Sequence, residues 1–306
     1  MSDGLLLAIS VGLAAVGGEL FVRGAVGFAA GMRVPPGIVG ATVAAFATST
    51  PEFSVAMNAA FTDQPAIALG DALGSNIVNI AVVLGLVLAF APLRPERPDI
   101  RRDLPVAFAA PLLTVALVAD GTFGRIDAVV ALLFFVTWLA ITVLQARRAR
   151  IATAEVLGER KLRLAGIEMA LGLGVLVVAG RLIVVAATGI GESLGLDKFI
   201  VGVTLVAFAT STPELATTVI ARLRGHGEIA LGTLVGSNIF NNLWIVGSAA
   251  LVSPIAVDRS DVAIAAVVGV AALALAIPIR GVLGRERALF LLGGYGLYVA
   301  ALVSTR

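Results

Sequence analysis

Residues 38–52 read IVGATVAAFATSTPE, and residues 200–214 read IVGVTLVAFATSTPE. The two stretches agree at 12 of 15 positions without a gap, at an offset of 162 residues. The same offset aligns IALGDALGSNIVNI at 67–80 with IALGTLVGSNIFNN at 229–242, where 9 of 14 residues are identical. Two separate blocks in one register indicate a duplicated chain, because self-similarity at a fixed period reflects a repeated structural unit.

The composition places both copies in a lipid bilayer. Of 306 residues, 59% are hydrophobic and 14% are charged, and the mean hydropathy is +1.02. Soluble domains carry about 25% charged residues. A net charge of +2 excludes nucleic acid as the main partner. The chain has no Cys and one His, His226, which excludes a disulfide framework and Cys/His metal sites, and no cofactor is expected.

Ten apolar runs approach the length of about 20 residues that a membrane-crossing helix needs. We therefore expect an all-α polytopic membrane protein. The start of the chain lacks the basic segment of a secretory signal and is interpreted as a retained first helix. The ten predicted spans are 4–24, 37–60, 66–91, 104–119, 126–146, 164–187, 200–221, 229–251, 262–279 and 287–304.

The duplication divides these spans into a first five-helix repeat at 1–150 and a second at 164–306, joined by a basic linker at 151–163. Because each repeat has an odd number of helices, the second must enter the membrane from the opposite side, so the repeats are inverted. Inverted repeats are typical of secondary transporters, whose binding sites form near the midplane between the repeats.

The basic residues predict the orientation. The odd-numbered connections between spans carry 17 Lys and Arg, whereas the even-numbered connections and both termini carry 4. Cytoplasmic loops hold the excess of positive charge. We expect a multi-pass protein of the cell (inner) membrane with both termini outside the cytoplasm, and a monomer in the bilayer.

Each repeat has one acidic residue in the middle of an apolar span: Glu52 in the first and Glu214 in the second. An ionisable side chain at that depth costs at least about 2.5 kcal/mol and usually faces a cavity, a partner or an ion path. The proline before each acid, Pro51 or Pro213, removes one helical hydrogen bond and frees a backbone carbonyl four residues earlier. The Thr-Ser-Thr triplet before each proline adds hydroxyl oxygens.

The second block of each repeat adds further oxygen atoms. Ser75 and Asn79 are four residues apart, as are Ser237 and Asn241, so each pair lies on one helix face. Ca²⁺ prefers six to eight oxygen ligands, and Na⁺ accepts similar oxygens. Two carboxylates can be neutralised by one Ca²⁺, by sodium ions or by protons, which is the competition that an antiporter requires.

These motifs resemble the alpha-repeats of the cation/calcium antiporter superfamily, and specifically those of prokaryotic sodium/calcium exchangers. The matching residues are ATSTPE with GSNIVNI in the first copy and ATSTPE with GSNIFNN in the second. The resemblance implies exchange of Ca²⁺ for Na⁺ by alternating access, with the first and sixth helices sliding over a core formed by the other eight.

The resemblance also implies ligands. Glu52 and Glu214 would bind Ca²⁺, assisted by the backbone carbonyls of Thr48 and Thr210. The implied sodium ligands are the carbonyls of Ala45 and Ala207, the side chains of Thr48, Thr210, Ser49, Ser211, Ser75 and Ser237, and the two glutamates. Asn79 and Asn241 would occupy the remaining polar corners of the centre.

The sequence departs from the family pattern in two respects. Ala47 and Ala209 stand where the family usually has Gly, which could narrow the turn and shift sodium affinity. Asn241 stands where several relatives, including potassium-dependent ones, carry Asp; this argues against potassium co-transport.

Proton-coupled cation exchange remains an alternative, although the G-N-x-x-E motif typical of such exchangers is absent. A remote alternative is an intramembrane hydrolase, but the repeated blocks contain no His, Arg or Lys to activate a nucleophile.

Two other acidic positions carry predictions. Glu19 and Arg181 are related by the same offset of 162, and we hypothesise an ion pair between the first and sixth helices. Asp71 lies one turn before Ser75 and is replaced by Thr233 in the second repeat. It is interpreted either as an attractor of cations at the outer mouth or as a solvated acid at a helix entry.

Overall fold

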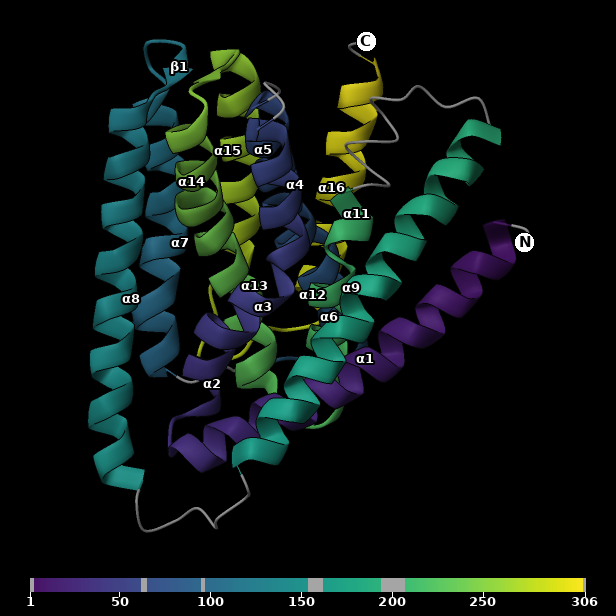
Figure 1. Ribbon diagram of the computed structural model, residues 1–306, viewed down its shortest axis with the longest axis vertical. Coiled ribbons are helices and arrows are strands. Elements are labelled where there is room, and N and C mark those ends of the chain that lie inside the picture. Colours follow the sequence, from purple (N-terminus) through teal and green to yellow (C-terminus); the bar gives the residue numbers. More distant parts are fainter. Residues whose placement is uncertain (1–2, 62–64, 95–96, 154–161, 194–206, 305–306) are drawn as a thin grey trace.

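The described part of the chain is almost entirely helical, as the apolar spans predict. The computed structural model describes residues 3–61, 65–94, 97–153, 162–193 and 207–304, and Figure 1 shows α1 and α9 slanting together beside the remaining helices. With η for a π-helix, the elements are α1 (Asp3–Met32), α2 (Pro36–Val39), η1 (Gly40–Ala44), α3 (Ala45–Thr48), α4 (Thr50–Phe61), α5 (Pro65–Ile77), η2 (Val78–Leu84), α6 (Gly85–Phe90), α7 (Arg97–Leu117), β1 (Thr122–Phe123), α8 (Arg125–Thr153), α9 (Leu162–Ser193), α11 (Ala207–Thr210), α12 (Thr212–Leu223), α13 (Gly227–Ile239), η4 (Phe240–Ile245), α14 (Val246–Val252), β2 (Ile255–Ala256), α15 (Arg259–Leu275) and α16 (Glu286–Ser304).

The described helices fall on all ten predicted spans. Several continue past the apolar run, since α1 reaches Met32 and α8 reaches Thr153, where the predicted spans end at 24 and 146. Residues 200–206 of the seventh span and 154–161 of the proposed linker lie outside the described residues. The division at 150 and 164 therefore stays a prediction.

The inverted duplication is visible in the backbone. Helix α12 begins and ends 162 residues after α4, and α13 begins and ends 162 residues after α5. At one end of α7, Leu93 forms a β-bridge with Leu283; at the other end, Phe123 pairs with Ile255. Leu93 and Ile255 are equivalent by the offset of 162, yet they lie at opposite ends of α7. The two five-helix repeats are therefore related by inversion.

Helices α1 and α9 form a tightly packed pair. A Cβ added to Gly172 on α9 would collide with the backbone of Phe21 on α1, and one added to Gly24 would collide with the backbone of Met169. Small residues allow helix backbones to approach closely in a bilayer, where dispersion contacts rather than hydrophobic burial drive association. The pair meets the rest of the fold at Gly18, which lies against Ala216 on α12.

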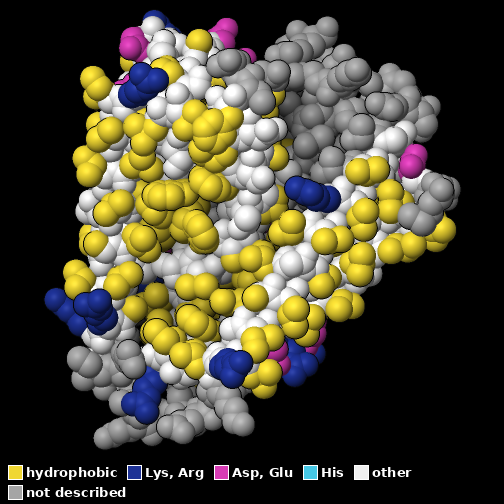
Figure 2. Space-filling view, viewed as in Figure 1, with side chains coloured by type: hydrophobic (Ala, Val, Ile, Leu, Met, Phe, Trp, Pro, Cys, Tyr) yellow, Lys and Arg dark blue, Asp and Glu magenta, His cyan; other side chains and the backbone are white. Residues whose placement is uncertain are grey.

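The surface suits a bilayer. Five described helical segments are long and apolar enough to cross it: Asp3–Met32, Pro65–Phe90, Arg125–Arg148, Leu162–Leu182 and Gly227–Val252. Figure 2 shows hydrophobic side chains over much of one flank, with most of the visible charged side chains toward its two ends. The chain is a multi-pass membrane protein.

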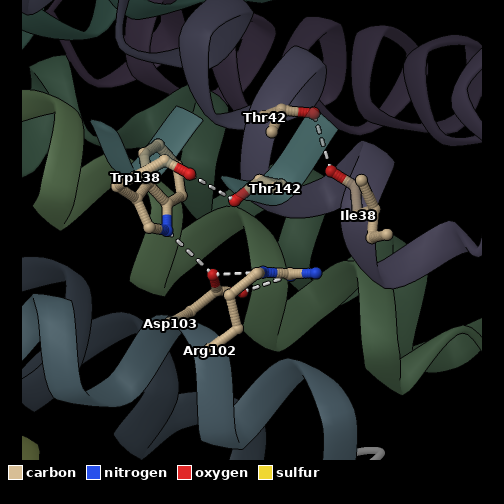
Figure 3. A network of polar contacts seen from close by, with 6 residues as sticks. All are labelled: Ile38, Thr42, Arg102, Asp103, Trp138 and Thr142. Atoms are coloured by element: carbon tan, nitrogen blue, oxygen red, sulfur yellow. Dashed lines mark hydrogen bonds and ion pairs between the residues drawn. The ribbon is translucent and has the colours of Figure 1, made fainter. Parts of the chain in front are cut away.

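A buried polar network fixes α7 against α8 (Figure 3). Arg102 donates two hydrogen bonds to Asp103, from Nε to Oδ1 at 2.6 Å and from Nη2 to Oδ2 at 2.5 Å. Trp138 Nε1 on α8 donates to the same Oδ1 at 3.0 Å. Arg102 is 8% exposed and Asp103 is 3% exposed, so each charge depends on its partner for compensation.

Candidate cation site

Two interrupted helices bring the predicted carboxylates into the interior. Ser49 separates α3 from α4 with φ −81° and ψ 11°, and Ser211 separates α11 from α12 with φ −79° and ψ 10°. Pro51 and Pro213 cause these breaks, because proline cannot donate to the carbonyl four residues earlier. The interruption is confined to one residue in each copy, so the backbone is bent rather than extensively unwound.

Close helix contacts position the serines around the carboxylates. A Cβ added to Gly236 on α13 would overlap the backbone of Ala41 in η1. The next residue, Ser237, consequently lies against α3 of the other repeat, with its Oγ 3.5 Å from the backbone oxygen of Ala45. The glycine of the repeated Gly-Ser-Asn motif thus sets the distance between the two repeats.

Glu214 is fully buried and held by both repeats. Ser49 Oγ donates to Glu214 Oε1 at 3.1 Å, and Ser237 Oγ donates to the same oxygen at 3.2 Å. The other carboxylate oxygen, Oε2, is buried and has no hydrogen-bond partner. A carboxylate with one oxygen fixed and one unoccupied can accept a cation without reorganising.

Glu52 is also fully buried, but its surroundings differ. Neither of its carboxylate oxygens has a hydrogen-bond partner. By the repeat symmetry, Ser211 and Ser75 should bond to Glu52 as Ser49 and Ser237 bond to Glu214. Instead the Oγ atoms of Ser211 and Ser75 are buried and unpartnered as well. Glu52, Ser75 and Ser211 therefore carry buried oxygen atoms without hydrogen-bond partners. Such a group of unpartnered atoms is unusual in a native protein interior.

Asparagine side chains close the centre. Asn79 Nδ2 donates to Asn238 Oδ1 at 3.2 Å, and Asn238 Nδ2 donates to the backbone oxygen of Asn76 at 3.1 Å. Asn241 is fully buried with no partner for its side-chain atoms. A small cavity borders Asn76, Asn238 and Asn242 on the side of α7 and α15. The side-chain oxygens of Asn79 and Asn241 are buried and have no hydrogen-bond partner.

Comparison with known proteins shows the family of the chain. Residues 3–147 and 166–304 match the family described as sodium/calcium exchanger protein. The chain belongs to the sodium/calcium exchanger family. It is therefore a cation/calcium antiporter, and the expected fold and family are both confirmed.

Individual relatives of the exchanger family agree over most of the chain. Inner membrane protein YrbG of Escherichia coli (strain K12) is 34% identical over 234 residues, which cover 74% of this chain and 72% of that protein. Sodium/calcium exchanger MaX1 of Methanosarcina acetivorans is 26% identical over 294 residues, covering 83% and 84%. A structure of the sodium-calcium exchanger NCX_Mj soaked with Na⁺ and Sr²⁺ aligns with a TM-score of 0.83 at 28% identity, covering 97% of both chains.

All of the predicted ligand side chains that the structure describes are buried at the repeat interface. Thr48 Oγ1 donates to the backbone oxygen of Ala45 at 3.3 Å, and Thr210 Oγ1 to that of Ala207 at 3.1 Å. The sequence analysis did not single out Thr217 and Thr218, which are fully buried one turn after Glu214 with unpartnered hydroxyls. Their position three and four residues after the acid was the available signal.

The predicted ion pair between Glu19 and Arg181 is wrong. Glu19 instead pairs with Arg224 at the turn after α12, with Nη2 to Oε1 at 2.5 Å and Nε to Oε2 at 3.0 Å. Repeat equivalence relates positions by inversion and does not bring them into contact. The paired helices α1 and α9 are bridged by Arg23 and Glu168 at 3.7 Å.

Asp71 is not a fully solvated helix-entry acid. Its Oδ2 is buried without a hydrogen-bond partner, and its carboxylate interacts electrostatically with both Glu52 and Glu214. Asp71 is therefore a partly buried acid on α5, near enough to the two glutamates to interact with them, whereas the sequence left its placement open between two interpretations.

Proposed function

We propose that this protein exchanges Ca²⁺ for Na⁺ across the cell membrane. The observation that supports this most strongly is the meeting of two fully buried carboxylates, Glu52 and Glu214, among oxygen donors from both repeats. Two buried negative charges need cationic compensation. The described residues around them supply carboxylate, hydroxyl, amide and carbonyl oxygens, which suit Ca²⁺ and Na⁺ better than transition metals.

The roles of the ligands follow from the family resemblance. Glu52 and Glu214 bind Ca²⁺ together with the backbone carbonyls of Thr48 and Thr210. Sodium ions occupy flanking positions formed by the carbonyls of Ala45 and Ala207 and by Thr48, Thr210, Ser49, Ser211, Ser75, Ser237 and both glutamates. The unpartnered oxygens of Glu52, Ser75 and Ser211 support an ion-binding role, because unused buried acceptors are otherwise costly.

Alternating access in this proposal uses α1 and α9 as one moving unit. Their interlocked backbones resist separation, while their contacts with the core are made by smaller surfaces such as Gly18 against Ala216. We further propose an inner-membrane location with both termini outside the cytoplasm. The relative YrbG of Escherichia coli is named an inner membrane protein, which agrees with that location.

The deciding experiment reconstitutes the purified protein into proteoliposomes and measures ⁴⁵Ca²⁺ uptake. One set of vesicles is loaded with Na⁺, and a matched set holds only a proton gradient, with the voltage clamped by an ionophore. Uptake driven by the sodium gradient supports the proposal. Uptake driven only by protons would replace it with the proton-coupled alternative, and no uptake under either gradient would exclude Ca²⁺ as the cargo.

A further inference from the structure

Asp71 is an acidic side chain whose role the ligand set described above leaves unassigned. It lies two turns inside α5, one turn before Ser75 and two turns before Asn79, so the three residues follow one helix face toward the centre. Its Oδ2 is enclosed without a hydrogen-bond partner, and no basic side chain among the described residues forms an ion pair with it.

Ser75 on this face and Glu52 on α4 also have side-chain oxygens without a hydrogen-bond partner. Ser75 is fully buried, and its Oγ has no hydrogen-bond partner. Glu52 is fully buried with both carboxylate oxygens unpartnered, and it interacts electrostatically with Asp71. Asp71, Ser75 and Glu52 thus each carry at least one buried side-chain oxygen without a hydrogen-bond partner.

The second repeat lacks this feature. The equivalent face of α13 carries Thr233, Ser237 and Asn241, so a hydroxyl replaces the carboxylate at the first position. Thr233 is fully buried, and Ser237 is already bonded to Glu214. The third carboxylate is therefore present in the first repeat only.

The three carboxylates do not form one shared coordination shell. Among the described residues, no group of three His, Asp or Glu side chains converges closely enough to hold a single metal ion. Asp71 is nevertheless close enough to interact electrostatically with both glutamates. With three negative charges, one Ca²⁺ at the central glutamates leaves one charge to be compensated at a separate position.

We propose that Asp71 and Ser75 form an additional binding position for a monovalent cation, one helical turn from the central site on the α5 side. This inference rests on the proposed function, because it assigns Na⁺ as the cation that occupies the position. A sodium ion there neutralises the third carboxylate and loads the path into the site from one side of the membrane.

The test uses the purified full-length protein in detergent, with thermal unfolding followed as NaCl replaces choline chloride at constant ionic strength. A parallel titration uses CaCl₂. Asp71→Asn should raise the sodium concentration for half-maximal stabilisation by at least about fivefold, while the calcium concentration shifts by less than about twofold. Asp71→Glu, which keeps the charge, should stay within about twofold of the wild type for both ions. Asp120→Asn is the matched control, because Asp120 is an exposed loop acid whose Oδ1 accepts a backbone hydrogen bond that Asn can also accept.

Each outcome decides the inference. An unchanged sodium titration in Asp71→Asn, or equal shifts for both ions, would overturn it while leaving the proposed exchange intact. A wild-type protein that neither ion stabilises would contradict the proposed exchange, and the inference would fall with it. If Asp71→Asn does not fold, Asp71→Thr is measured in its place, since the second repeat has the buried Thr233 at the equivalent position.

Discussion

Ser49 of the first repeat donates a hydrogen bond to Glu214 of the second, at 3.1 Å from Oγ to Oε1. The bond joins the break between α3 and α4 to the first turn of α12, so the interrupted helix of the first repeat holds the carboxylate of the second. Its symmetry counterpart, from Ser211 to Glu52, is not formed. The duplicated sequence thus produces an asymmetric site, with one carboxylate held and the other unpartnered.

The two serines on Glu214 should matter more for Na⁺ than for Ca²⁺. Ser49→Ala and Ser237→Ala each remove one hydroxyl that stabilises the ionised carboxylate and, in the proposal, binds sodium. We expect each to raise the sodium concentration for half-maximal ⁴⁵Ca²⁺ exchange by at least about tenfold, because one lost hydrogen bond to a charged group costs about 1.5–3 kcal/mol. Ser10→Ala is the control, because Ser10 is a buried serine that bonds only within its own helix, to the backbone oxygen of Leu6. Equal effects of all three substitutions would contradict the assigned roles.

The pairing of α1 with α9 predicts a sharp difference between two glycines on α9. Gly172→Ala places a methyl group against the backbone of Phe21 and should destabilise the protein by about 1–3 kcal/mol through overpacking. Gly174→Ala meets no atom within 4 Å and should be neutral or stabilising by up to about 1 kcal/mol, because Ala favours a helix. Thermal unfolding in one detergent measures both. A Gly172→Ala protein as stable as Gly174→Ala would show that the two helices are not closely packed.

The ion pair between Glu19 and Arg224 joins the α1 and α9 unit to the core. Glu19→Arg or Arg224→Glu should lower the initial rate of calcium uptake by about two- to fivefold, within the range expected for a partly exposed ion pair. The double reversal should restore most of the rate, because the two charges can then pair in the opposite sense. Glu19→Arg combined with Arg181→Glu should restore nothing. Recovery in that second combination, and not in the first, would contradict the observed pairing.

Comparison of the two sequence repeats predicted those parts of the structure that depend on local sequence. The breaks at Ser49 and Ser211 follow from the adjacent prolines, and the matching bounds of α5 and α13 follow from the shared block. The same comparison predicted the wrong ion-pair partner for Glu19, because contacts between helices depend on how the helices pack and not on sequence equivalence. The π-helices at Val78–Leu84 and Phe240–Ile245 were also not predicted, since π-helical turns are rare interruptions inside α-helices.

The buried network between α7 and α8 predicts a graded loss of stability. Asp103→Ala removes the carboxylate that accepts two hydrogen bonds from the buried Arg102 and should destabilise the fold by about 3–5 kcal/mol. Trp138→Phe removes only the indole donor to Asp103 and should cost about 1 kcal/mol. Thermal unfolding midpoints check the order. Equal midpoints for the two variants would show that the network does not carry the charge compensation assigned to it.

The asymmetry of the site was hidden from sequence comparison. Identical Thr-Ser-Thr-Pro-Glu segments predict identical surroundings for Glu52 and Glu214, yet only Glu214 accepts hydrogen bonds from serines. The difference depends on how the two repeats are positioned in this conformation. The sequence did contain one asymmetric signal, Asp71 opposite Thr233, but its burial could not be inferred without the packing of α5.

The most direct test of exchange at the two central carboxylates is ⁴⁵Ca²⁺ uptake into sodium-loaded proteoliposomes by Glu52→Gln and Glu214→Gln. Glu286→Gln serves as the control, because Glu286 is an exposed acid in the first turn of α16. We predict that each central substitution reduces uptake by at least about 100-fold, because removal of a fully buried charged ligand is worth about 3 kcal/mol or more, while the control keeps the wild-type rate. Wild-type flux in either central variant would contradict the assignment of Glu52 and Glu214 as the exchange site.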